Sequence, residues 1–416
     1  MKKLLFFVLL TFSLEAQTLN MQTCVQEALA NHPDIKIFML KVAQSEKSYE
    51  IARSEYLPQA TLLGEYDPQH TYVLQQSGQF GTIDDESWSI SALLKQKIWD
   101  FSKTSSLIEA SRIDQHIAKL SLDDAKALMA YKIKSLYALM ALQYKAIKVR
   151  RQDMQTKKAL YKQTLGFQKQ GLRTKADVAR FHAAYSLAKE ELETAQASFN
   201  KSRNTMSLYT GMPLQNNVKP DIRTIASNAI DLKNRYALKQ QALKENFQIK
   251  IASKQIDKTQ KLYQAAKASH FGSIDATVSH TQADGLNQYD TSTIGITLSI
   301  PLYSGGRLSA EEQRMKIEAN AAQEQLASRA IVLREELENL FLDLESYRES
   351  IKAKKAQLLS AQEAQKAASA RYKAGLATYI EVLDGTALLL QAKLGLLEIG
   401  YKQRIALNRI DYLTGQ

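Results

Sequence analysis

The chain repeats one unusual local pattern, an amphipathic strand that leads directly into a long helix. Residues Ile294–Ile300 alternate apolar and polar side chains with the period of two that is typical of a strand with one apolar face. Pro301 ends regular strand pairing, and a Ser-Gly-Gly turn precedes a helical run that begins at Arg307. Residues Ile90–Lys103 match Ile294–Arg307 in order, because 294 − 90 and 307 − 103 both equal 204. The duplication predicts two halves with the same plan.

The constant spacing sets the expected domain boundaries. It holds without a gap from Trp99 and Tyr303 to Gly211 and Gly415. We predict a first repeat over residues 17–213, an inter-repeat linker over 214–233 and a second repeat over 234–416. The β-hairpins are expected at about 59–99 and 272–303, and the helical hairpins at about 103–210 and 307–414. In the first β-hairpin, the polar stretch 67–86 is expected to be a long loop.

Each helical hairpin is predicted to reverse at a short turn. Gly171 and Gly375 suit the left-handed position that follows a helix C-terminus. Thr174 with Asp177, and Thr378 with an acid three residues later, resemble the capping box that opens a new helix. With only 16 Gly and 6 Pro in 416 residues, the flanking helices are long. Their apolar stripes therefore need coiled-coil partners.

The first residues predict export from the cytoplasm. Lys2 and Lys3, an apolar run and Ala16 form a secretory signal peptide over residues 1–16. The single cysteine, Cys24, excludes an intrachain disulfide, and the residues before it do not resemble a lipid-attachment signal. We expect Cys24 to pack in a short helix instead. After the signal peptide no uncharged apolar run reaches ~18 residues, so any membrane-spanning part must consist of strands closed into a barrel.

Composition argues against a nucleic-acid partner and against an enzyme. The formal charge of +12 comes from Lys and Arg scattered among Glu and Asp along helices, which favours solvated helix faces. The six histidines show no metal-ligand spacing, and Gly305-Gly306 indicates a turn rather than a phosphate loop. We expect neither a metal nor a cofactor.

The number of strands predicts an oligomer. Two hairpins supply four strands, whereas a closed barrel needs roughly eight or more. A trimer would supply twelve strands, and its long helices would form a twelve-helix tube.

Several motifs together resemble the TolC-like outer membrane factors. They are Asn31–Asp34, Ile300–Arg307, Gly375–Asp384 and the duplicated plan itself. The resemblance covers essentially the whole mature chain. It implies a mainly α fold with membrane β: a homotrimer with a 12-stranded β-barrel in the outer membrane, joined to a 12-helix α-barrel in the periplasm. Such channel-tunnels serve tripartite efflux or type I secretion, together with a periplasmic adaptor protein and an inner-membrane pump, and they export drugs, metals or proteins.

The resemblance also implies a periplasmic gate. Glu381 and Asp384 lie three residues apart, so they share a helix face, and the matching acids of the family line the constriction as rings. For Glu381 the capping box is an equally good explanation. Asp177 and Tyr372 match an acid and a tyrosine whose bonds, with an arginine, hold the family's entrance closed. Ala377 stands at the arginine position, and nearby Arg173 is the candidate substitute.

The hairpin tips are the expected adaptor contacts. Gly171, Leu172, Gly375 and Leu376 form them, with an exposed leucine at each turn; the alternative is a leucine folded inward. The alternative function is a non-channel periplasmic coiled coil, either structural or an adaptor. A structural coiled coil would not explain four amphipathic strands, and an adaptor would require a lipoyl-like β-domain.

Overall fold

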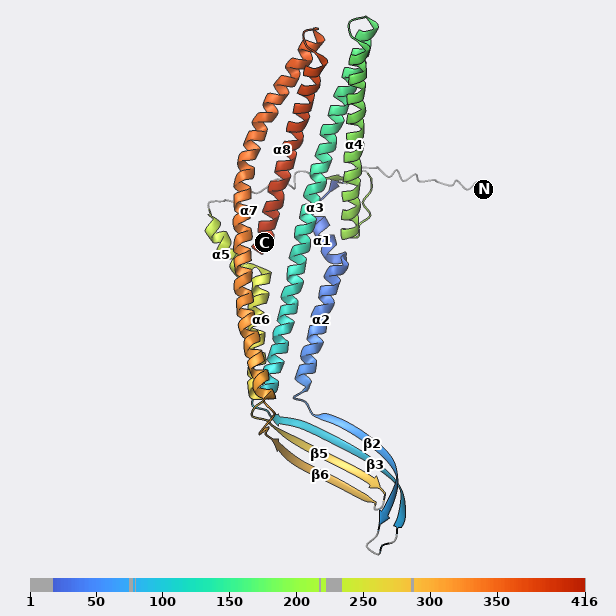
Figure 1. Ribbon diagram of the computed structural model, residues 1–416, viewed down its shortest axis with the longest axis vertical. Coiled ribbons are helices and arrows are strands. Elements are labelled where there is room, and N and C mark those ends of the chain that lie inside the picture. The colour runs from blue at the N-terminus through green and yellow to red at the C-terminus, as the bar shows by residue number, and fades with distance from the viewer. Residues whose placement is uncertain are drawn as a thin grey trace, which may run out of the picture. The chain divides into compact units, whose positions relative to one another are not determined.

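The computed structural model describes residues 18–74, 78, 80–216, 218–221, 234–285 and 288–415. The expected signal peptide and most of the expected linker lie outside these residues. The chain divides into two compact units, which we describe separately. The first contains residues 1–36, 124–246 and 332–416, and the second contains 37–123 and 247–331. Figure 1 labels the elements.

The first unit is built from helices. Its elements are α1 (Met21–Asn31), the start of α2 (Pro33–Ser54), most of α3 (Lys103–Lys169), α4 (Lys175–Thr210), α5 (Arg235–Glu245), the second part of α7 (Arg307–Lys373) and α8 (Tyr379–Leu413), with a small parallel pair of β1 (Thr18–Leu19) and β4 (Lys219–Pro220). Helices α3 and α7 both have 67 residues, and α4 and α8 have 36 and 35. These matched lengths follow the duplication in the sequence.

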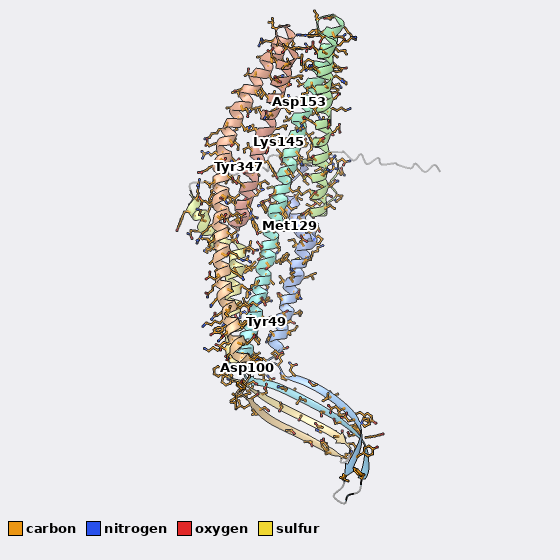
Figure 2. The ribbon with its side chains drawn as sticks, in the orientation of Figure 1. Tyr49, Asp100, Met129, Lys145, Asp153 and Tyr347 are labelled. Carbon is orange, nitrogen blue, oxygen red and sulfur yellow. The ribbon has the colours of Figure 1, made fainter. Side chains whose placement is uncertain are left out.

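The second unit joins helices to a sheet. It contains the rest of α2, the first turns of α3 and α7, helix α6 (Phe247–Ala268), and strands β2 (Gln59–Leu74), β3 (Phe80–Trp99), β5 (Ser273–Asp284) and β6 (Tyr289–Ser299). The four strands pair antiparallel in the order β2-β3-β5-β6. Strands β2 and β6 are therefore the edges of the sheet. Figure 2 labels Asp100 where β3 passes into α3.

One face of the sheet carries a row of unpartnered apolar side chains. On β6, Ile294, Ile296 and Leu298 alternate with polar residues, and Ile294 is 84% exposed. The register aligns Ile294 with Val278 of β5 and Val278 with Leu94 of β3. The apolar face thus continues across three strands without a covering layer in the part of the chain that the structure describes.

The expected long loop over residues 67–86 is wrong. Strand pairing continues from Asp67 with Ser87 to Leu74 with Phe80, so the loop shrinks to the tip of the hairpin. A strand ladder is made by backbone groups, and an antiparallel sheet tolerates polar side chains on a face that contacts water. Polar composition therefore did not end these strands.

The residues around Asn246 form a break between two consecutive helices. Helix α5 ends at Glu245 and α6 begins at Phe247. The side-chain amide of Asn246 is buried and donates to the carbonyl of Leu413, 3.1 Å away. This bond satisfies one of the unpaired carbonyls at the end of α8 and separates the two short helices.

The single cysteine lies in the core of the first unit. Cys24 is fully buried in α1, and burial raises the pKa of its thiol to about 12. The prediction that it packs in a short helix is confirmed. Among the described residues, every helix is too short or too polar to span a membrane.

Candidate functional site

Both helical hairpins of the first unit reverse through the same glycine turn. In the first, Gly171 adopts φ 75° and the N–H of Leu172 donates to the carbonyl of Phe167 at 2.9 Å. In the second, Gly375 adopts φ 78° and the N–H of Leu376 donates to the carbonyl of Arg371 at 2.8 Å. These bonds satisfy carbonyls at the ends of α3 and α7, as in a Schellman motif.

The leucines of the two turns point to solvent. Leu172 is 65% exposed and Leu376 is 70% exposed. An inward-folded leucine is therefore excluded at both tips. Each hairpin presents one large apolar side chain at its end.

The two predicted capping boxes are confirmed. Thr174 and Asp177 exchange hydrogen bonds between side chain and backbone at 3.1 Å in both directions, and these bonds open α4. Thr378 and Glu381 do the same at 3.1 and 3.4 Å at the start of α8. Both acids thus have a structural partner within their own helix end.

The second capping box also carries a charge partner that sequence reasoning missed. Arg371 lies 3.3 Å from the carboxylate of Glu381 and also donates to the carbonyl of Leu376 at 3.3 Å. The N–H of Thr378 and the charge of Arg371 lower the pKa of the Glu381 carboxyl below its ordinary value. The glycine turn in the sequence could have indicated this pair, because it places the end of α7 beside the start of α8.

Tyr372 lies at the centre of the packing between the hairpins. It is 1% exposed and packs with Leu160, Phe181, Ala377 and Val382. The Phe181 ring meets it edge to face, with the ring centroids 5.7 Å apart. The close packing around Ala377 accounts for a small residue at that position.

Two polar contacts complete the surroundings of Tyr372. Its hydroxyl shares a hydrogen bond with the hydroxyl of Thr164 at 3.0 Å. The guanidinium of Arg173 lies over its ring, 4.5 Å from the centroid. Helix α3, the first turn and helix α7 thus meet at this tyrosine. Asp177 is held instead by the backbone of Thr174.

Asp384 differs from the other predicted gate residues. It is exposed on α8 and has no hydrogen bond or ion pair within the residues that the structure describes. Glu381 precedes it by three residues and is half-buried. The two carboxylates share one side of the first turns of α8, and only Glu381 serves a cap.

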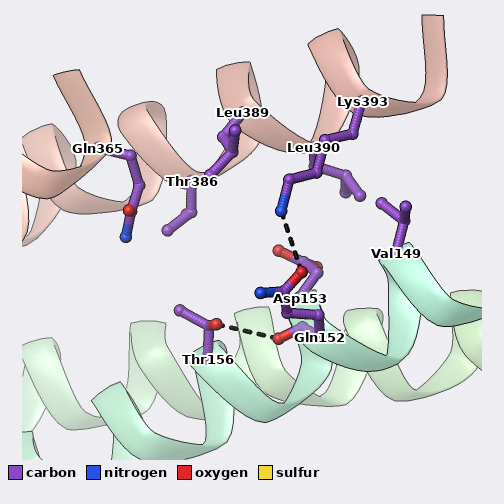
Figure 3. A pocket seen from close by; sticks show the side chains of 9 residues that line it. All are labelled: Val149, Gln152, Asp153, Thr156, Gln365, Thr386, Leu389, Leu390 and Lys393. Carbon is purple, nitrogen blue, oxygen red and sulfur yellow. Dashed lines mark hydrogen bonds between the residues drawn. The ribbon is translucent and has the colours of Figure 1, made fainter. Parts of the chain in front are cut away.

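Further along the same hairpins, a polar hollow separates α3 from α8 (Figure 3). Lys393 crosses it and donates to the side chain of Gln152 at 3.0 Å. Asp153, which also lines it, forms a 2.9 Å ion pair with Lys157, and both side chains are at least nine-tenths buried. The hollow thus contains polar groups that are already paired.

The chain contains two capped helical hairpins of matched length. Each hairpin follows strands that have an unpartnered apolar face. This duplicated order is typical of a class of outer-membrane proteins with long helices. The chain belongs to the outer membrane efflux protein family, whose model matches residues 24–212 and 238–416. It is an outer-membrane protein of the Gram-negative type with a large periplasmic part.

The chain resembles named members of this class along nearly its full length. It is 26% identical over 425 residues to the outer membrane protein TolC of Escherichia coli K12, covering 97% of this chain and 82% of that protein. It is 22% identical over 413 residues to the cation efflux system protein CusC of the same strain, covering 95% and 86%.

Solved structures share the fold. The outer-membrane channel OprN gives a TM-score of 0.84 at 16% identity and covers 95% of this chain and 89% of that one. The outer membrane protein VceC of Vibrio cholerae gives 0.81 at 16% identity and covers 95% and 96%.

Proposed function

We propose that three copies of this chain form a channel that gives cargo a passive, gated exit across the periplasm and the outer membrane. The observation that carries the proposal is the open sheet of the second unit. Strands β2 and β6 each pair on one side only within the described chain. A lipid bilayer cannot satisfy such edges, so they need partner strands from other copies.

The arithmetic of closure favours a trimer. One chain supplies the four strands of this sheet. Closed transmembrane barrels need roughly eight strands or more, and three chains supply about twelve. The same association brings the long helices of three chains together as a helical tube that continues the barrel. A non-channel coiled coil would leave the sheet edges and the apolar row on β6 without a purpose.

The proposed gate lies at the hairpin tips. In a trimer, Glu381 and Asp384 form two rings of acids, which attract cations in a narrow pore. Tyr372, with Thr164 and Arg173, holds the two hairpins of each chain together. Arg173 thereby supplies a cation near the position where Ala377 has none. Asp177 supports this arrangement by fixing the start of α4.

The exposed turns at the tips are the proposed contacts for an adaptor. Leu172 and Leu376 project from equivalent turns, so three chains would present six similar apolar side chains. A periplasmic adaptor and an inner-membrane pump would complete a tripartite assembly. Relatives include the cation efflux system protein CusC and the proteases secretion protein PrtF of Dickeya chrysanthemi, so the proposal covers efflux and secretion. The chain itself carries out no catalysis in this proposal.

Single-channel conductance in planar bilayers tests the channel and its gate together. The wild type is expected to show a small, cation-preferring conductance. The double variant Glu381→Ala with Asp384→Ala is expected to conduct more and to lose cation selectivity. Glu363→Ala is the matched control, because Glu363 is an acid on α7 that is already paired with Lys366.

The conductance measurements distinguish the acidic gate from the channel itself. A conductance that the double variant leaves unchanged would contradict the acidic gate and retain the channel. A folded trimer without any conductance, in the wild type and in the double variant, would contradict the channel itself.

A further inference from the structure

The end of the first helical hairpin accounts for half of the formal charge of the chain. Residues 157–180 contain seven Lys or Arg and one acid, Asp177, which gives +6 of the total of +12. The equivalent residues of the second hairpin, 361–384, contain three cations and three acids. Both hairpins reverse at the same end of the first unit (Figure 1). The two tips therefore share a fold and differ in charge.

Three of these lysines lie on one face of α3. Lys158, Lys162 and Lys169 are exposed, and the half-buried Leu165 lies between the last two. At 3.6 residues per turn, the four residues fall within an arc of about 60° and extend over about 16 Å of helix. The buried Leu160 lies on the opposite side of α3. This set of four, which we call the lysine stripe, thus faces away from the packing between the helices.

The spacing of the lysine stripe is that of a contact between two helices. Its members follow one another at steps of four, three and four, and a further step of three reaches Leu172 in the turn. The same alternation places the residues of a coiled-coil seam against a second helix. Because three of the four positions are lysines, a helix that packs here needs acids beside its apolar residues.

The lysines of the stripe have no carboxylate partner. None of the three forms an ion pair within the residues that the structure describes. The Nζ of Lys158 lies 6.0 Å from the ring centroid of Tyr185, a contact that leaves its charge uncompensated. The adjacent Lys157 differs, because it is buried and pairs with Asp153 at 2.9 Å. The charge of the stripe is therefore available to a partner.

A further exposed lysine lies where a helix disfavours a cation. Lys175 is the first residue of α4, so its charge lies at the positive end of the helix dipole. Its equivalent in the second hairpin, Tyr379, packs against the cluster around Tyr372. Acids of a partner beside the first tip would account for the cation at this position.

Other copies of the chain do not supply the missing acids at this end. Glu363 and Glu381 are already paired with cations of α7, at 2.9 and 3.3 Å. Asp177 is held in its own capping box. Of the acids in residues 157–180 and 361–384, this leaves Asp384. In the proposed trimer equivalent hairpin ends lie at the same level, so the complement has to come from another protein.

We propose that the lysine stripe binds an acidic helix of the periplasmic adaptor. That helix lies along the end of α3, with carboxylates against the three lysines and apolar side chains against Leu165 and Leu172. The inference rests on the proposed function, because it takes the adaptor to be the partner of the hairpin tips. It adds that the first tip selects its partner by charge, whereas the second tip carries no net charge.

Two synthetic helical peptides test the proposal on the purified trimer. Both repeat leucines at steps of four and three, and the flanking positions are glutamates in one peptide and lysines in the other. Fluorescence anisotropy is expected to show at least tenfold tighter binding of the glutamate peptide at low salt. The difference should shrink as NaCl screens the charges. Equal affinities for the two peptides would overturn the proposal.

Removal of the lysines tests where the glutamate peptide binds. Exposed ion pairs each contribute about two- to threefold in affinity, so the triple variant Lys158→Gln, Lys162→Gln and Lys169→Gln is expected to weaken binding about tenfold. Unchanged binding would overturn the proposal. Reversal of the same three residues to Glu is expected to make the trimer prefer the lysine peptide, a result that a damaged fold does not produce.

A matched control removes three exposed lysines from α7 of the second hairpin. The variant Lys355→Gln, Lys366→Gln and Lys373→Gln is expected to change the affinity for the glutamate peptide less than twofold. An equal loss in this variant and in the α3 variant would overturn the proposal, because net charge rather than the stripe would then decide binding.

Two other partners would give different results. A membrane surface as the partner would appear as binding of phosphatidylglycerol vesicles through the stripe, with no preference between the peptides. A second copy as the partner would appear as loss of the trimer in the triple glutamine variant of α3. Either result would overturn the proposal.

Conductance of the same preparations distinguishes this inference from the proposed function. The triple glutamine variant of α3 is expected to conduct as the wild type does. A conducting trimer that does not discriminate between the peptides contradicts the lysine stripe alone. A chain that forms no conducting trimer contradicts the proposed function, whichever peptide it binds.

Discussion

The two connections from strand to helix in the second unit solve one backbone problem in two ways. We call residues 99–103 the first elbow and residues 303–307 the second elbow. Both need two consecutive residues in the left-handed region. The second elbow uses Gly305 and Gly306, with φ 63° and 81°, whereas the first uses Phe101 and Ser102, with φ 55° and 72°. Side chains in this region cost about 1–2 kcal/mol per residue.

The first elbow offsets this strain with contacts that the second lacks. Asp100 is buried and accepts from the N–H of Thr104 at 2.8 Å, and Lys97 donates to the Thr104 hydroxyl at 3.0 Å. Phe101 packs against Phe271, with ring centroids 5.4 Å apart. At the second elbow, among side chains of the described residues, only Ser304 takes this place, by accepting from the N–H of Leu308 at 3.4 Å. Glycine thus adopts the left-handed conformation without a steric cost, whereas Phe101 and Ser102 need the stabilising contacts of a buried cap.

The largest loss of stability is expected from a substitution at Gly272 of the second repeat, where the backbone leaves no room for a side chain. Gly272 precedes β5 at φ 85°, and a Cβ there would lie 1.9 Å from the carbonyl oxygen of Ser299. Gly272→Ala is expected to destabilise the fold by about 3 kcal/mol or more, because backbone must move as well as adopt a strained φ. Guanidinium unfolding in detergent, followed by circular dichroism, measures it. Gly295→Ala is the control, with only ordinary contact to Thr277; equal effects of the two would contradict the steric argument.

Removal of the side-chain cap should reduce the free energy of unfolding far more at the first elbow than at the second. Asp100→Ala removes the acceptor of a buried N–H and is expected to cost about 2–3 kcal/mol. Ser304→Ala, at the equivalent position, removes a long bond and is expected to cost less than about 1 kcal/mol. The same unfolding experiment compares them. If Ser304→Ala costs as much as Asp100→Ala, the two elbows do not differ as we describe.

A substitution that relieves backbone strain at the first elbow should increase stability, in contrast to the variants above. Ser102→Gly is expected to stabilise the chain by about 1 kcal/mol, because glycine adopts φ 72° without a Cβ penalty. The reciprocal change Gly306→Ser is expected to destabilise it by a similar amount. A shift of the unfolding midpoint in the same direction for both variants would show that left-handed strain does not decide the choice of residue.

The smallest effect concerns the capped tips in the first unit. The two capping boxes are alike, but Arg371 supports only the second, and Phe167 stands at its equivalent in the first. The pKa of Glu381 is lowered, so its contribution to helix stability is present above its ordinary pKa and is lost as pH falls through the lower folded value. Hydrogen exchange in the first turn of α8 is therefore expected to quicken slightly below about pH 4.5 relative to the intrinsic rate.

The arginine decides how low that transition lies. Arg371→Gln is expected to move the lower end of this transition to higher pH and to reduce its size, because one of the groups that lower the folded-state pKa of Glu381 is gone. Lys366→Gln is the control, since Lys366 pairs with Glu363 on the same helix. An unchanged lower end and size of the transition in Arg371→Gln would contradict the contribution of Arg371 to the pKa of Glu381.

The sequence predicted those features that depend on local chemistry. The turns at Gly171 and Gly375 and the capping boxes at Thr174 and Thr378 were found because each depends on a few adjacent residues. The duplication revealed the order of strands and long helices for a similar reason, since equal spacing is visible without knowing any contact.

Features that depend on distant contacts were missed. Tyr372 meets Thr164, which is 208 positions away, and no local pattern pairs them. The left-handed Phe101 and Ser102 were missed because their own preferences oppose the conformation. The cap of Asp100 on Thr104 is local, but the ring of Phe271 that packs on Phe101 is distant in the sequence. For the proposed gate, sequence comparison supplied the positions, while the contacts of Arg173 and Arg371 came only from the fold.

The open edges of the sheet also affect how the protein must mature. A single exported chain presents β2 and β6 unpaired, and such edges are templates for faulty pairing and aggregation. In the proposed trimer, all edges are satisfied only once three chains have met, so the rate of correct assembly would rise steeply with chain concentration, whereas the helical hairpins can form within one chain. A cell that exports this chain slowly therefore gains time for quality control and loses speed of assembly, and escort proteins that shield strand edges would relieve that conflict.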